Sequence, residues 1–214
     1  MHLLISALVA TIPLVIVIWG FERARPRPRD LMPVVVLTAL AILGRVVTMP
    51  IPNFQPATAL IILAGLFFGK HAGMLSGMLV ALISNMIMGQ GPWTPWQMLA
   101  WGLVGYGAGL LGSLVRLTKW QDLKISPRNT IFYVAAILAY GAVTSLLFGM
   151  FMDLQYFIAF AWETSWAGLF TTWTLGLPFN IAHAVSTIAF LALTLIPWGK
   201  KLHRLKTKYN IRSI

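Results

Sequence analysis

Seven apolar segments divide this chain, and the connections between them are sorted by charge. We place the segments near residues 3–21, 31–50, 56–69, 72–89, 95–116, 129–151 and 166–198. A helix needs about 20 apolar residues to cross the hydrocarbon layer of a membrane, so the segments predict membrane-spanning helices. The third segment is short and needs cover from its neighbours. The composition agrees, because 58% of the 214 residues are apolar and only five are acidic.

Lysine and arginine fall almost entirely in alternate connections. The basic connections contain Arg23, Arg25, Arg27 and Arg29, then Lys70, then Arg116, Lys119, Lys124 and Arg128, and finally Lys200 to Arg212. The intervening connections carry amides, tryptophans and two acids. Membrane insertion retains lysine and arginine on the cytoplasmic side. The pattern therefore predicts a multi-pass protein of the cell membrane, with its N-terminus outside and its C-terminus cytoplasmic.

The same pattern divides the chain into three parts. Residues 1–29 are predicted to form an N-terminal transmembrane anchor and a stiff basic linker, 30–199 a six-helix substrate-binding core, and 200–214 a basic cytoplasmic tail. A signal peptide is the alternative for the first helix, but arginines follow it where a small-residue cleavage site is expected. The fold class is thus an all-α integral membrane protein, with one helix, peripheral to the rest, in front of a six-helix core. We expect Pro178 to interrupt the last helix.

One stripe of small residues predicts close helix packing. Gly73, Gly77, Ala81, Asn85 and Gly89 recur every four residues and therefore share one helix face. Small side chains let a second backbone approach, which is the usual device between helices in lipid. The next segment carries glycines in the same way. Packing explains the glycines but not Asn85, whose polar side chain lies near the outer end of its helix.

The residues present exclude several kinds of chemistry. The positive charges, +11 net, flank apolar spans instead of forming a stripe, so we expect contact with membrane lipid and none with nucleic acid. Cysteine is absent and the four histidines are scattered, so neither thiolate chemistry nor a metal site is predicted. Residues 65–71 lack the spacing and the hydroxyl residue of a phosphate loop. No cofactor is therefore expected on this chain.

The predicted outer face is rich in aromatic and amide side chains. The candidates for ligand contact are Asn85, Gln90, Trp93, Thr94, Trp96, Gln97, Trp101, Asn180 and His183. A belt at the membrane interface is the simpler explanation of the tryptophans. Aromatic rings are nearly absent from the basic connections, however, and this asymmetry favours a pocket of the kind that binds small molecules. His183 alone is more typical of a satisfied interior histidine.

Arg45 lies about one turn inside the outer end of its helix. A cation at that depth is costly unless it is paired or hydrated. Two interpretations stay open: the side chain reaches outward to the interface, or it faces a wet cavity. An enzyme built on paired acids at this face would have to use Asp153 and Glu163, which lie in a predicted loop.

A series of short motifs runs through residues 31–116: Asn53-Phe54-Gln55-Pro56, Ala59-Leu60, Ala64-Gly65-Leu66-Phe67-Phe68-Gly69, and the helix with Gly73, Gly77 and Asn85. In these motifs the chain resembles the substrate-binding S components of energy-coupling factor (ECF) vitamin transporters. Residues 89–98 are similar to the cobalamin branch of that family. Asn53 and Gln55 become further candidates for ligand contact.

The resemblance implies that the chain binds a vitamin, with cobalamin favoured, from the outer face. It also implies partners, namely a membrane-embedded coupling subunit and two cytoplasmic ATPases. ATP is then hydrolysed by the partner ATPases, and this chain is not an enzyme. Many S components dock on the coupling subunit through an Ala-x-x-x-Ala pattern. Ala41, Gly44 and Thr48 are the docking candidates here, although they do not match that pattern cleanly.

Two other functions are open to a chain of this composition besides transport by an S component. The alternative is a membrane-embedded enzyme that acts on a lipid-like substrate at the outer interface, with Asp153 and Glu163 as its acid and base. A standalone permease is disfavoured, because the chain shows no internal repeat or paired broken helices.

Overall fold

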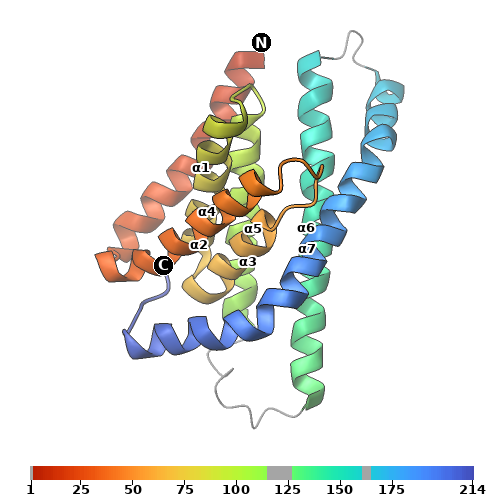
Figure 1. The fold of residues 1–214 in the computed structure, drawn as a ribbon. Helices are drawn as coiled ribbons and strands as arrows, with labels where there is room; N and C mark the ends of the chain where they lie inside the picture. The colour runs from red at the N-terminus through yellow and green to blue at the C-terminus, as the bar shows by residue number, and fades with distance from the viewer. Residues whose placement is uncertain (1, 115–126, 161–164) are drawn as a thin grey trace.

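The computed structural model describes residues 2–114, 127–160 and 165–214, and the regular structure in these ranges is α-helical (Figure 1). The helices are α1 (His2–Ala24), α2 (Pro28–Val47), α3 (Ala57–Phe68), α4 (Lys70–Met88), α5 (Thr94–Leu114), α6 (Pro127–Phe160) and α7 (Trp166–Lys208). Each predicted apolar segment is therefore a helix. Arg116, Lys119, Lys124 and Glu163 lie outside the described residues.

Within the described ranges, four helices are long and apolar enough to cross a membrane: α2, α4, α6 from Ile131 onward, and α7. α3 is apolar but has only 12 residues, and all of them are buried, so its neighbours cover it as its short length predicts. Large apolar side chains such as Val35, Leu43 and Leu193 are exposed on the bundle surface. Such a surface suits lipid, and the protein is a multi-pass membrane protein.

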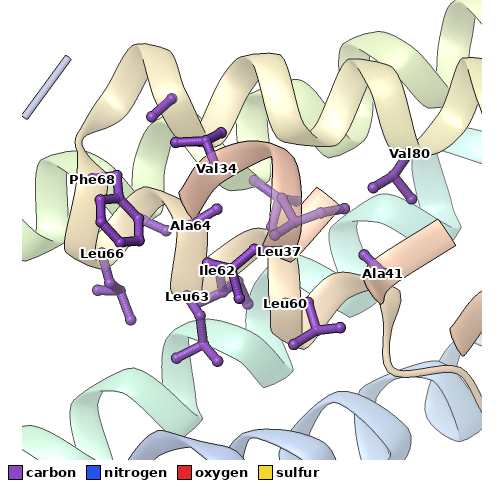
Figure 2. Close-up of a cluster of buried hydrophobic side chains, with 14 of the residues drawn as sticks. Val34, Leu37, Ala41, Leu60, Ile62, Leu63, Ala64, Leu66, Phe68 and Val80 are labelled. Carbon is purple, nitrogen blue, oxygen red and sulfur yellow. The ribbon is translucent and has the colours of Figure 1, made fainter. Parts of the chain in front are cut away.

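The hydrophobic core is built around α3. Figure 2 shows α3 side chains, from Leu60 to Phe68, beside Val34 and Leu37 of α2 and Val80 of α4. Because every face of α3 is covered, a polar side chain on it must find its hydrogen-bond partners inside the protein. Thr58 is that side chain, and it is buried near the start of the helix.

α4 and α5 pack backbone against backbone, as the small-residue stripe predicts. A Cβ atom added at Gly73 would overlap the carbonyl group of Gly105, and one added at Gly77 would overlap that of Trp101. Gly89 has a different role, because the space beside it is open and its φ is 120°. It ends α4 in a backbone conformation that favours glycine.

Two expectations about the last helices are wrong. Pro178 does not interrupt α7, which is helical from Trp166 to Lys208. Neighbouring helices and local adjustment can satisfy the backbone group that a proline frees inside a membrane helix. Figure 1 shows the C-terminal part of α7 lying across the end of the bundle. Asp153, expected in a loop, lies within α6.

The bundle has two chemically different ends. The connections between α2 and α3 and between α4 and α5 lie at one end, which we call the polar end. The α1–α2 connection, the α3–α4 turn and residues 208–214 lie at the other, which we call the basic end. α1, expected to be peripheral, packs against α4 and α5.

Residues 200–214, expected as a tail, are part of the folded bundle. α7 continues to Lys208, and the chain then folds back so that Ile214 N donates to Phe68 O and His71 N donates to Ile214 O. Asp30 fixes the same region to α2, because its carboxylate accepts bonds from the Arg27 side chain and from Arg212 N. The basic end is therefore closed by the chain itself.

Candidate functional site

Arg45 is buried near the polar end, with 7% of its surface exposed. Its Nη1 donates to Ser84 Oγ and to Asn85 Oδ1 (2.8 Å), and its Nε donates to Gln55 Oε1 (3.3 Å). The guanidinium also lies over Trp101, with Cζ 4.8 Å from the ring centroid. Of the two interpretations of Arg45, the inward one is therefore correct. Amide, hydroxyl and aromatic groups compensate for the buried charge.

Asn85 links Arg45 to the connection between α4 and α5. Its Nδ2 donates to Thr94 Oγ1 (2.9 Å) and to Gln97 Oε1 (2.8 Å), while its Oδ1 accepts from Arg45. Thr94 in turn donates to Gln90 Oε1 (2.7 Å). Both ends of the Asn85 amide are thus used. A buried network of this kind is rigid when satisfied and costly when one member is removed.

A second group of contacts meets the first at Trp101. The indole Nε1 donates to Thr58 Oγ1 (3.0 Å), and Thr58 Oγ1 lies 2.7 Å from His183 Nε2. Phe148 stacks on Trp101 with ring centroids 4.8 Å apart and meets His183 edge-on at 5.1 Å. α3, α5, α6 and α7 are therefore joined at one point, with Trp101 and Phe148 as its aromatic walls.

Between these two groups lies a cavity of about 90 Å³, which we call the polar cavity. Its lining residues are Arg45, Asn53, Gln55, Ala57, Thr58, Gln97, Trp101, Phe148 and His183. An open hollow of about 350 Å³, the apolar cavity, lies between α5 and α6, and its lining includes Val104 and the exposed side chains of Leu103 and Leu147. Phe148 borders both cavities.

The structure brings most of the predicted site residues together. Five of them line the polar cavity: Asn53, Gln55, Gln97, Trp101 and His183. Asn85, Gln90 and Thr94 lie behind that lining and hold it in place through the hydrogen bonds described above. The loop that carries Gln55 is also fixed to α7, because Ser186 Oγ donates to Gln55 O (3.0 Å).

Three predicted site residues lie elsewhere. Trp93 covers Gly91 in the α4–α5 connection, and Trp96 is buried with its ring 5.2 Å from that of Phe151. Asn180 Nδ2 donates to Asp153 Oδ2 (2.8 Å) between α6 and α7. Residue type alone does not separate these side chains from the cavity lining, because both groups are aromatic or amide residues on the same end of the chain.

Apart from Ala57 and from Arg45, whose two interpretations are given above, three residues of the site were not among the candidates. Thr58 had a usable signal, since it is the one polar residue in an otherwise apolar segment, and Ser84 adjoins Asn85. Phe148 had no such signal, because it is one of 12 phenylalanines and its helix has no distinct polar face.

The docking candidates lie on α2 and at its C-cap, where Ala41 is buried and Gly44 and Thr48 are half-buried. Ala41 is fully buried in the core (Figure 2), and a Cβ atom added at Gly44 would overlap Pro56. Thr48 Oγ1 donates to Gly44 O (2.7 Å) within the helix. Docking of a coupling subunit through these residues stays a prediction, and it would require α2 to expose a face that packs inward here.

The residues required by the enzyme alternative are not assembled in the described structure. Asp153 is partly buried and bound by Asn180, while its predicted partner Glu163 lies outside the described residues. Among the described residues, no group of three or more histidines, cysteines or acids is placed to hold a metal ion.

Comparison with known proteins identifies the family. A family model described as ECF-type riboflavin transporter, S component, matches residues 28–197. The match begins at the first residue of α2 and leaves out α1, which agrees with an extra helix in front of the family core. No curated protein and no solved structure matches the chain. The matched region is well over half of the chain, which therefore belongs to the family of ECF-type riboflavin transporter S components, membrane subunits of transporters and not enzymes.

Proposed function

We propose that this chain is the substrate-binding subunit of an ECF-type vitamin importer, and that its ligand is riboflavin. The description of the matching family supports a flavin. The observation that carries the proposal is the position of Phe148, which stacks on Trp101 and borders both a polar cavity and an apolar one. A flat ligand ring would replace the Phe148 ring beside Trp101.

The size of the cavities supports this exchange. The polar cavity, about 90 Å³, is smaller than the roughly 300–1,000 Å³ typical of small-molecule sites. The apolar cavity adds about 350 Å³ on the other side of Phe148. Rotation of the Phe148 side chain would join the two, and the joined space would fall within the typical range. Ligand entry is therefore expected to depend on this one aromatic side chain.

The chemistry of the joined space matches the two parts of riboflavin. The apolar cavity would take the methyl-substituted side of the ring system, with Trp101 stacked on its face. Gln97, Gln55 and Arg45 would supply hydrogen bonds to the carbonyl and imide groups or to the ribityl hydroxyls. A few directed polar groups among apolar walls are the usual arrangement for such ligands.

Cobalamin, which the motif at residues 89–98 favoured, is the second ligand to test. It is several times larger than riboflavin, so it would require the α2–α3 and α4–α5 connections to move apart. The hydrogen bonds of Asn85 to Thr94 and Gln97 oppose such a movement. Riboflavin therefore requires the smaller rearrangement.

Orientation and partners complete the proposal. Since the basic end carries most of the described arginines and lysines, with Arg45 as an exception, we expect it to lie in the cytoplasm, with the polar end and the N-terminus outside. The vitamin would then enter from outside. A membrane-embedded coupling subunit and two cytoplasmic ATPases would supply the transport step, and ATP would be hydrolysed on those partners.

Flavin fluorescence tests the proposal directly, because stacking on tryptophan quenches it. Titration of riboflavin with the purified protein should show saturable quenching. Trp101→Leu should weaken binding by roughly 1–3 kcal/mol, the cost of removing a central aromatic contact. Trp166→Leu is the matched control, since Trp166 is 79% exposed and lies far along α7 from the cavity, and it should bind as the unchanged chain does.

Three outcomes would contradict the proposal. Absence of binding to either riboflavin or cobalamin would remove the vitamin assignment. Binding of cobalamin alone would leave an importer subunit but overturn the flavin. Equal weakening by both tryptophan substitutions would show that the ligand does not stack at Trp101.

A further inference from the structure

A further cavity lies at the basic end, far from the polar cavity. It has a volume of about 710 Å³ and runs between α2 and the last part of α7. Its walls are apolar side chains from both helices: Met32, Val36 and Leu40 of α2, and Trp198, Leu202 and Leu205 of α7. We call it the α2–α7 groove.

Basic side chains form the rim of this groove. Arg29 lies at the α2 side, and Lys201 and Lys208 lie at the α7 side, all three exposed. None of the described residues that line the groove is acidic. Asp30, the acid next to Arg29 in the sequence, is fully buried and already bound by Arg27 and by Arg212 N. The rim therefore carries positive charge that the described part of the chain does not neutralise.

We propose that an anionic phospholipid binds in the α2–α7 groove. Its acyl chains would lie along the apolar walls, and its phosphate would lie among Arg29, Lys201 and Lys208. The two chemical zones of the groove correspond to the two parts of such a lipid. The end of α7 lies across the bundle like an interfacial helix (Figure 1), with basic residues beside an apolar face, and such helices favour anionic lipid.

A protein helix fits the groove less well. An apolar helix would fill the walls but would remove the rim cations from water without supplying negative charge, which is costly. A lipid phosphate supplies that charge. The site is independent of the proposed vitamin, because the groove and the polar cavity share no lining residue.

Native mass spectrometry of the purified full chain tests the proposal. The probes are phosphatidylglycerol and phosphatidylcholine with identical palmitoyl and oleoyl chains. The protein should retain phosphatidylglycerol after delipidation and retain phosphatidylcholine at least several-fold less. Lys201→Gln with Lys208→Gln should lower retention of phosphatidylglycerol by roughly tenfold, since each basic residue near an anionic lipid contributes a several-fold effect.

The same helix supplies the matched control. Lys200 and Arg204 are also exposed, but neither lines the groove. Lys200→Gln with Arg204→Gln removes the same charge and should change retention less than twofold, a bound we set well below the several-fold effect expected per contacting cation. Val36→Trp fills the groove without changing charge and should lower retention of both lipids. Dihexanoyl-phosphatidylglycerol, which has the head group but short chains, should compete poorly.

Several results would overturn the proposal. Equal losses in the two double variants would indicate a general effect of charge. Equal retention of the two lipids, or full retention by Val36→Trp, would remove the groove as the binding site. Unchanged lipid retention with lost co-purification of the partner subunits would assign the groove to a protein.

Discussion

The helices α3 to α5 and the pair α6 and α7 are joined in different ways. α3, α4 and α5 meet at glycines, where an added Cβ atom at Gly65, Gly73 or Gly105 would overlap a neighbouring backbone. α6 and α7 pack mainly on each other. They meet the other helices through side chains, such as Ile137 and Leu191 in the shared core and Tyr140 Oη, which donates to Val104 O (2.6 Å), and the apolar cavity lies between α5 and α6.

This difference shows where the bundle is able to open. Backbone-to-backbone contacts leave no space for one helix to move relative to the other, whereas contacts between single side chains are replaceable. The polar cavity lies at the boundary, since Arg45, Gln97 and Trp101 come from the tightly packed side and Phe148 and His183 from the other. A ligand site at such a boundary combines a fixed wall with a movable one.

The largest expected loss of stability comes from the fixed wall of the polar cavity, the side that carries Arg45, Gln97 and Trp101. Asn85→Leu removes the amide that accepts from Arg45, and it leaves the buried guanidinium with fewer partners. Breaking one partner of a buried charge typically costs about 3–5 kcal/mol. We expect a large drop in the midpoint of thermal unfolding in detergent. Adding Arg45→Met should recover part of the loss, because the uncompensated charge is then gone.

Met86→Leu is the control for that variant. Met86 follows Asn85 on α4 but is 70% exposed, so the substitution should leave the unfolding midpoint nearly unchanged. If Asn85→Leu and Met86→Leu unfold at the same temperature, the network around Arg45 does not stabilise the fixed wall.

The next largest loss of stability distinguishes two glycines of α5, one in contact with a neighbouring backbone and one that is not. Gly105→Ala places a methyl group against the Gly73 carbonyl, and overpacking of this kind costs roughly 1–3 kcal/mol. Gly102→Ala lies one turn away, and the nearest atom to its Cβ would be Met74 Cγ at 3.4 Å. The first variant should unfold at a lower temperature than the second. A reversed order would mean that α4 and α5 are not in backbone contact.

The sequence was sufficient to predict the helices and their close packing on the tightly packed side of the molecule, α3 to α5. Apolar length located the helices, and the four-residue spacing from Gly73 to Asn85 indicated both the packed face and the one polar residue that packing did not require. These features are local, because they depend on spacing within one segment. Gly89 shows the limit of the pattern, since it shares the spacing but serves to end α4.

The other side could not be predicted in the same way. α6 has no distinct polar face, so its sequence does not reveal that Phe148 faces Trp101. Similarly, Asn180 and His183 lie nearly one turn apart on α7, yet Asn180 binds Asp153 while His183 lines the polar cavity. Which of two such residues reaches the site depends on the rotation of a long helix, and that rotation is fixed by partners distant in the sequence.

A third, smaller effect concerns the movable wall. If Phe148 must rotate before riboflavin enters, only a fraction of the molecules is ready to bind at any moment, and apparent affinity falls by that fraction. Phe148→Ala should therefore raise the association rate, by roughly fivefold for a cost of about 1 kcal/mol. Stopped-flow measurement of the quenching of flavin fluorescence gives this association rate. Phe151→Ala is the control, because Phe151 lines the apolar cavity and not the polar one. If riboflavin instead associated more slowly with the Phe148→Ala variant, the Phe148 ring would assist binding.

The smallest effect tests the attachment of α6 to α5. Tyr140→Phe removes the hydroxyl that donates to Val104 O, and single hydrogen bonds between membrane helices contribute only about 0.6 kcal/mol on average. The unfolding midpoint should fall slightly, while hydrogen exchange in α6 should rise relative to α4. Tyr156→Phe, at an exposed position on the same helix, should alter neither. If exchange in α4 rose as much as in α6, the two sides would open as one unit, and the boundary at the polar cavity would not be the place where the bundle separates.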